Sequence, residues 1–333
     1  MRKIFFIIIC CVLSISFCNS CKKAKQRPQT VTPIDTTTVN VPQFSADSAY
    51  FFVEKQVNFG ARVPNTPAHV QCAEYLSKTL QRFGAQVIEQ KIQLQAFDGK
   101  TLDAVNIVAA FQPEKTRRIM LCSHWDSRPF ADQDPDPSKH NTPVLGANDG
   151  ASGVGILLEI ARLLAADTSD IGVDIIFFDA EDYGAPENVQ VANSSATWCL
   201  GSQYWSKNPH RSNYTAQYGI LLDMVGAPDA VFFREYYSDY FAPNVVNKVW
   251  QKADELGFSQ YFANQQGGSV LDDHLPVNQN IGIPCIDIIH YNPHSRYKGF
   301  GDYWHTLKDN MQNIDRKTLN AVGVTLVNVI YNE

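Results

Sequence analysis

The chain has 333 residues, of which 44% are hydrophobic, 11% aromatic and 19% charged. This composition excludes a disordered protein, which would contain fewer aromatic and more charged residues. The formal net charge of −6 argues against a nucleic-acid partner held through its phosphates. We therefore expect a globular protein that binds no nucleic acid, in a chain long enough to bury a full hydrophobic core.

Residues 1–20 have the pattern of a secretory signal peptide. A basic start at Arg2 and Lys3 precedes an apolar run over residues 4–17, which is short for a membrane-spanning helix. The alternative is a membrane anchor that stays attached. The short run favours a signal peptide that is removed, so we expect the protein to be exported.

Cys21 follows Ser20 and resembles the acceptor cysteine of a bacterial lipoprotein. Residues 21–43 are rich in Lys, Gln, Thr and Pro, which is typical of a flexible tether, and residues 44–333 form the expected catalytic domain. No acid directly follows Cys21, which favours the periplasm over surface display. In this interpretation the protein meets a membrane only through its lipid.

The eight cysteines do not form a scaffold pattern. Half of them lie in the leader, and the others are spread singly through the rest of the chain: Cys72, Cys122, Cys199 and Cys285. No pair has the CxxC spacing of a thiolate zinc site or a redox motif. One disulfide in an oxidising compartment stays open as an alternative to buried free thiols.

Apolar periodicity predicts alternating strands and helices. In chain order we expect a helix over 67–83, an alternating outer strand over 87–97, buried strands over 105–111 and 118–122, a helix beginning near 153, strands over 173–178 and 219–222, a helix over 243–256, a strand over 285–289 and a helix over 319–329. Gly84 and Gly257 are expected to end two of the helices. This order predicts an α/β fold, a single-domain three-layer sandwich around a mixed, mostly parallel central sheet.

Polar residues follow each buried strand. Ser-His-Trp-Asp follows the strand over 118–122, Asp-Ala-Glu-Asp follows 173–178, Asp223 follows 219–222 and His290 follows the last strand. Ligands of such sheets bind at the carboxyl ends of the strands. We therefore expect the chemistry of this protein at one edge of the sheet.

The loop around Asp149 has glycines on both sides, in Gly146-Ala-Asn-Asp149-Gly150-Ala-Ser-Gly153. Such a loop suits a carboxylate held close to a bound ion, and capping of the next helix by Asp149 is the structural alternative. Asp179, Glu181 and Asp182 follow an apolar strand. Adjacent acids there are costly unless a cation or a proton relieves their repulsion, although a solvated acidic turn is the alternative.

His305, in Trp304-His305-Thr306, completes a set of two carboxylates and one imidazole with Asp149 and Asp182. Three such ligands with an open fourth position are typical of a catalytic zinc. Asp223 and Asp272 could pair across the cleft, and two carboxyls that close would share a proton. For Asp272 and Asp273 the structural alternative is capping of a helix ahead of Leu275.

These motifs, with Leu-Leu-Asp223-Met-Val-Gly-Ala-Pro and Asp272-Asp-His274, make the sequence from about residue 50 onward resemble the glutaminyl-peptide cyclotransferases (glutaminyl cyclases), which share the fold of the zinc aminopeptidases. The resemblance, carried over by motif, implies one zinc per chain on Asp149, Asp182 and His305. It implies that Glu181 is the proton shuttle, that Asp223 and Asp272 are its hydrogen-bonded acid partners, and that Trp304 and Trp198 line the substrate site. Animal cyclases have Glu at the Asp182 position, so the shorter ligand must come closer here.

The implied reaction converts the N-terminal Gln of a peptide to pyroglutamate and releases ammonia, with the Gln side-chain amide oxygen on the zinc and the α-amine as nucleophile. The expected partners are Gln-led peptides and exported proteins, and the expected state is a monomer. A secreted di-zinc aminopeptidase is the alternative, with Asp149 bridging two ions and His124 and Asp223 on the second. A binding protein that has lost catalysis is disfavoured because no ligand and no shuttle residue is missing.

Overall fold

The computed structural model describes residues 40–333. Its central sheet has six strands in the order β1-β2-β4-β3-β5-β8. The strands are β1 (Gln86–Gln95), β2 (Thr101–Phe111), β3 (Arg118–His124), β4 (Gly172–Phe178), β5 (Gly219–Asp223) and β8 (Cys285–Ile289). The pairs β3/β4, β3/β5 and β5/β8 are parallel, whereas β1 and β2 form an antiparallel hairpin that joins β4. A separate parallel pair consists of β6 (Phe232–Arg234) and β7 (Phe262–Gln266).

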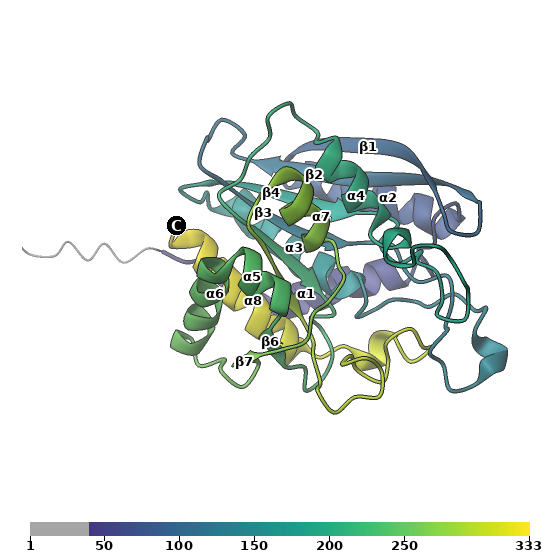
Figure 1. Cartoon of the computed structure of the whole chain (residues 1–333). Coiled ribbons are helices and arrows are strands. Elements are labelled where there is room, and N and C mark those ends of the chain that lie inside the picture. Colours follow the sequence, from purple (N-terminus) through teal and green to yellow (C-terminus); the bar gives the residue numbers. More distant parts are fainter. Residues whose placement is uncertain (1–39) are drawn as a thin grey trace, which may run out of the picture. The chain divides into compact units, whose positions relative to one another are not determined.

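Helices cover both faces of this sheet (Figure 1). The helices are α1 (Ala46–Val57), α2 (Pro67–Arg82), α3 (Ala151–Ala166), α4 (Leu200–Lys207), α5 (Tyr236–Phe241), α6 (Pro243–Glu255), α7 (His274–Pro276) and α8 (Arg316–Tyr331), with short turns η1 (Pro137–Lys139), η2 (Ser195–Thr197), η3 (Val277–Ile281) and η4 (Met311–Asn313). One layer contains α1, α3, α6 and α8, in which α8 contacts the other three helices. On the opposite face of the sheet, α4 packs against α7. The expected three-layer sandwich around a mostly parallel sheet is therefore confirmed.

The buried strands send alternate side chains into two cores. Ile119 and Leu121 of β3 belong to the larger core, beneath the layer that contains α3, whereas Met120 and Cys122 belong to the smaller core on the opposite face. The period of two places successive side chains on opposite faces. Because both faces are covered, these strands are apolar throughout, which is why they appear as continuous apolar runs in the sequence.

The helix ends follow the sequence signals. Gly84 and Gly257, with φ of +83° and +82°, directly follow the C-caps of α2 and α6, as expected for residues in the left-handed region. The apolar pattern did not predict α1, α4, α5 or α7, nor the short strands β6 and β7. The last three helices and β6 are too short for several periods of the pattern, and β7 is mostly polar and exposed, so it has no apolar run.

The predictions for the leader concern residues largely outside the described part of the chain. The signal peptide over 1–20, Cys21 and most of the tether over 21–43 belong to that group. Among the residues that the structure describes, no helix has the length and apolar character needed to cross a membrane. The four cysteines of the described part are buried and form no disulfide with one another.

Candidate active site

Three parallel strands deliver polar residues to one edge of the sheet. β3 ends at His124, β4 ends at Phe178 just before Asp179, and β5 ends at Asp223. Because β4, β3 and β5 are neighbours, the residues that follow them converge. The loop before α3 and the loop containing His305 complete the cluster from distant parts of the chain.

Asp149, Asp182 and His305 form the first candidate metal site. One ligand atom from each lies within 4.8 Å of the others. His305 Nε2 lies 3.2 Å from Asp182 Oδ1 and 3.7 Å from Asp149 Oδ2, and all three residues are buried. The structure thus brings together the three residues that the sequence suggested as ligands.

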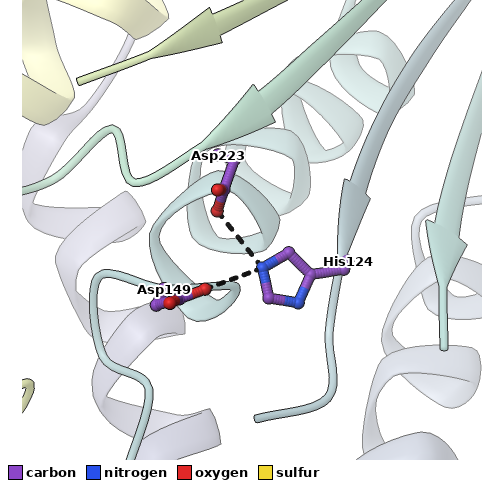
Figure 2. A group of neighbouring side chains, drawn as sticks. All are labelled: His124, Asp149 and Asp223. Atoms are coloured by element: carbon purple, nitrogen blue, oxygen red, sulfur yellow. Dashed lines mark hydrogen bonds and ion pairs between the residues drawn. The ribbon is translucent and has the colours of Figure 1, made fainter. Parts of the chain in front are cut away.

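His124, Asp149 and Asp223 form a second group of the same kind. Figure 2 shows both carboxylates directed at one nitrogen of the His124 ring, at 3.0 Å for Asp149 and 3.2 Å for Asp223. Asp149 belongs to both groups, as a bridging ligand of two ions would. Donor atoms for a second ion are therefore present beside those for the first.

The backbone of the loop fixes the direction of Asp149. Gly150 is the N-cap of α3 with φ of +88°, and a Cβ there would lie 2.9 Å from the His124 ring. Glycine at this position therefore lets the loop backbone approach the His124 ring closely. The Asp149 side chain points at His124 and makes no capping bond to α3, so the capping alternative is not what the structure shows. Asp309 accepts hydrogen bonds from the backbone N–H of Asp149 and its neighbour.

The donor set of the first group fits a divalent cation. Both carboxylate oxygens of Asp182 are buried without a hydrogen-bond partner among the described residues. Burial and the charge of Asp149 raise the pKa of Asp182 to about 6, and the same two causes raise the pKa of Asp223 to about 6. A cation would replace the protons that these crowded carboxyls otherwise hold. Two carboxylates and an imidazole are ligands that zinc accepts.

Glu181, the neighbour of Asp182 in the chain, belongs to a third group of side chains. It forms a buried cluster with Asp272 and Cys199, and the Cys199 thiol donates to Glu181 Oε1 at 3.2 Å. Burial raises the pKa of Glu181 well above its usual range, and the charges of Asp272 and Asp182 raise it further. A carboxyl with a raised pKa is suited to accept and return a proton near neutral pH.

Asp272 stands between Glu181 and the second group. Burial and then the charge of Asp223 raise its pKa to about 7. Its Oδ1 accepts a hydrogen bond from the backbone N–H of Asp273, whereas its Oδ2 has no partner among the described residues. Asp273 does not cap α7 with its side chain, and its carboxylate accepts a bond from Ser202 instead. The pairing of Asp223 with Asp272 across the cleft stays a prediction.

Both predicted wall residues stack on His305. The Trp304 ring centroid lies 3.9 Å from that of the imidazole, and the Trp198 ring lies 5.8 Å away at an interplanar angle of 6°. The two indoles therefore lie next to the first candidate metal site. They provide apolar surface beside its otherwise charged donors.

Two further residues of the site, Asp126 and Asp132, were given no role from the sequence. Asp126 accepts bonds from the backbone N–H groups of Glu181 and Asp182, at 3.1 and 3.2 Å. Asp132 Oδ1 lies 3.4 Å from His305 Nδ1. The position of Asp126 directly after a strand was a usable signal, but nothing in the local pattern distinguishes Asp132.

The backbone around the site is also unusual. Four residues other than glycine adopt positive φ there, at 49° to 55°: Ala180, Cys199, Met224 and His305. Such conformations are costly for residues with a Cβ and collect at functional sites. Each of the four is a functional residue or lies next to one in the chain.

Comparison with known proteins identifies the family of this chain. The family model described as "Peptidase family M28" matches residues 106–330. Glutaminyl-peptide cyclotransferase of Bos taurus is 26% identical over 295 residues, which cover 80% of this chain and 76% of the relative. Among solved structures, Tannerella forsythia glutaminyl cyclase is 57% identical with a TM-score of 0.86, and it covers 88% of this chain and 100% of its own. A Zn-dependent exopeptidase from Parabacteroides distasonis is 56% identical with a TM-score of 0.87 and the same coverage. The chain belongs to peptidase family M28.

Proposed function

We propose that the chain is a glutaminyl-peptide cyclotransferase, which converts the N-terminal Gln of peptides to pyroglutamate and releases ammonia. The observation that carries this proposal is the buried cluster of Glu181 and Asp272 beside the metal-ligand group. It provides a carboxyl of raised pKa next to a second carboxyl whose pKa is about 7. The similarity to the bovine enzyme and to the Tannerella cyclase supports the same activity.

One zinc per chain is proposed on Asp149, Asp182 and His305. The fit depends on the two buried Asp182 oxygens without hydrogen-bond partners among the described residues and on the mutual approach of the three side chains. When bound, zinc would polarise the side-chain amide carbonyl of the substrate Gln as a Lewis acid. The relation to a Zn-dependent exopeptidase supports this choice of metal.

The residues of the chain account for the proton transfers. The nitrogen of the substrate α-amine attacks the carbon of the side-chain amide, and Glu181 takes a proton from this amine. The new C–N bond closes a five-membered ring. Glu181 then returns the proton to the amide nitrogen as its C–N bond breaks, so ammonia leaves and no water is consumed. Asp272 lies close enough to Glu181 to keep its pKa high, which favours both transfers near neutral pH. Trp304 and Trp198 would hold the apolar part of the Gln side chain and keep water out.

A two-metal aminopeptidase is the second candidate, favoured by one specific observation. His124, Asp149 and Asp223 bring donor atoms together in the geometry that a second ion would need. Against this, the proposed cyclotransferase needs only the first group of donors, and the similarity to the bovine and Tannerella cyclases supports that activity.

Two measurements on the purified protein separate these candidates. A cyclotransferase releases ammonia and pyroglutamyl product from Gln-led peptides, and a chelator that removes zinc inhibits it. An aminopeptidase releases free amino acids from Ala- or Leu-led peptides and leaves Gln-led ones uncyclised, which would contradict the proposal. Metal analysis gives one zinc per chain for the cyclotransferase, whereas two tightly bound zinc ions would favour the peptidase.

We further propose that the chain is exported to the periplasm, carries a lipid on Cys21 after removal of residues 1–20, and acts as a monomer on exported proteins with N-terminal Gln. The basic start and short apolar run of the leader support export. Mass spectrometry of the membrane fraction would detect the lipidated N-terminus, and replacement of Cys21 by Ser should release the protein from that fraction. An unprocessed N-terminus in the cytoplasm would contradict this placement.

A further inference from the structure

Arg128 is a buried cation that the proposed reaction does not use. Its side chain is 1% exposed and lies just beyond the end of β3, four residues after His124. A buried guanidinium is stable only when its donors are bonded. The groups that accept these bonds are therefore the ones that Arg128 holds in place.

The guanidinium binds two features next to the metal-ligand group. Nε and Nη2 donate to the two carboxylate oxygens of Asp132, each at 2.9 Å. Asp132 Oδ1 in turn lies 3.4 Å from Nδ1 of His305, the imidazole nitrogen on the far side of the ring from Asp182. A carboxylate at this nitrogen fixes the tautomer and the ring orientation of a metal-binding histidine.

The remaining donor reaches the segment of a second ligand. Arg128 Nη1 donates to the backbone carbonyls of Asp182 and Gly184, both at 2.9 Å. These bonds fix the backbone on both sides of Tyr183 and therefore the point from which the Asp182 carboxylate projects. The shorter Asp side chain at this ligand position must approach the ion closely, so its backbone position matters more than that of a longer ligand would.

The flat face of the guanidinium supports the substrate wall. Arg128 Cζ lies 4.5 Å from the ring centroid of Trp198, within the range of a cation–π contact. Trp198 also packs so tightly on Gly184 that a Cβ there would lie 2.0 Å from the indole. One side chain thus contacts the ligand segment, the partner of the ligand His305 and the indole wall.

We propose that Arg128 is the positioning residue that sets the zinc affinity and the substrate wall of this site, through its bidentate bond to Asp132, its two carbonyl bonds and its stack on Trp198. This inference rests on the proposed zinc site. The role requires the planar fork of arginine. Lysine supplies the same charge as a point and cannot make the bidentate pair, the carbonyl bonds and the stack together.

The chain contains a matched control at the other end of the same strand. Arg118, 7% exposed, also donates through Nε and Nη2 to the two oxygens of one carboxylate, that of Asp174. It likewise donates to backbone carbonyls, including that of Gln112 at 2.7 Å. It starts β3, whereas Arg128 follows its end, and the strand between them spans about 20 Å.

The experiment measures the zinc dissociation constant of Arg128→Lys and Arg118→Lys by competition with a chromophoric chelator, together with KM and kcat for a Gln-led peptide. Both variants should lose stability to urea, because each loses a buried bidentate pair. Only Arg128→Lys should bind zinc 10- to 100-fold more weakly and show a raised KM. Equal zinc affinity in the two variants would overturn the inference.

A second pair of variants covers the case in which Arg128→Lys does not fold. Asp132→Asn keeps the shape of the side chain and removes the charge next to His305, and Asp174→Asn is its control. Weaker zinc binding in Asp132→Asn alone supports the inference, and equal binding in both contradicts it. A wild-type chain that bound no zinc would overturn the proposed function and this inference together, whereas wild-type zinc binding without a difference between the pairs would overturn the inference alone.

Discussion

Replacement of Asp272 by Asn should stabilise the metal-free protein above neutral pH while it impairs the reaction. Asp272 is 3% exposed, and burial together with the charge of Asp223 raises its pKa from 3.8 to about 7. In the unfolded chain the same carboxyl ionises without this cost. At pH 8 the buried carboxyl must either hold a proton or carry its charge away from water, and both cost free energy. Asp272 therefore destabilises the folded state at this pH.

The size of the effect follows from the two pKa values. Between pH 3.8 and about 7 the folded state binds more protons than the unfolded state at this position, so its contribution to stability falls as pH rises through that window. The difference of about three pH units corresponds to an upper limit of about 4 kcal/mol. We expect about 2 kcal/mol in practice, because the neighbouring carboxyls readjust when one of them becomes neutral.

Urea unfolding of the metal-free variant and wild type at pH 4 and pH 8 tests this expectation. The variant should gain little at pH 4 and about 2 kcal/mol at pH 8, whereas Asp170→Asn, a change at an exposed loop residue, should gain nothing at either pH. With zinc restored, Asp272→Asn should lose about 100-fold or more in turnover, since Asp272 supports the proton shuttle. A variant less stable than wild type at pH 8, or equally stabilised at both pH values, would refute the reasoning.

Three further results are expected. Glu181→Gln should lower turnover by about 10²- to 10⁴-fold with zinc still bound by metal analysis, and loss of zinc would show instead that Glu181 is a ligand. Zinc at about 1,000 times its dissociation constant should raise the free energy of unfolding of the metal-free protein by about 4 kcal/mol, and an unchanged urea midpoint would contradict a folded-state zinc site. Burial lowers the pKa of His290 to about 4, so the unfolded state binds more protons there between pH 4 and 6.5 and wild-type stability falls as pH falls through that window. Between pH 7 and pH 5 the free energy of unfolding of metal-free His290→Gln should fall by about 2 kcal/mol less than that of wild type. An identical fall in both proteins would refute this.

The strands of the sheet could be predicted because the requirement for apolar side chains is visible within each strand's own residues. Buried strands such as β3 and β4 must be apolar on both faces, and that requirement appears as an uninterrupted run. Helices α2 and α6 end at Gly84 and Gly257 because these glycines occupy the left-handed region at low cost. The short elements α5 and β6 lacked any such signal, since neither is long enough for a periodic pattern.

Sequence alone predicted which residues meet at the candidate site, because the polar residues that follow buried strands must gather where the parallel strands end. His305 and Asp149 were recognisable by their motifs, and the structure brings them together with Asp182.

Only the tertiary structure decided which residues hold that group in place. Asp309 bonds to the loop of Asp149 across 160 residues, and Arg128 joins Asp132, Asp182 and Trp198. The physical reason is that local periodicity depends on neighbours in the chain, whereas the partners of a buried charge depend on which loops meet at the edge of the folded sheet.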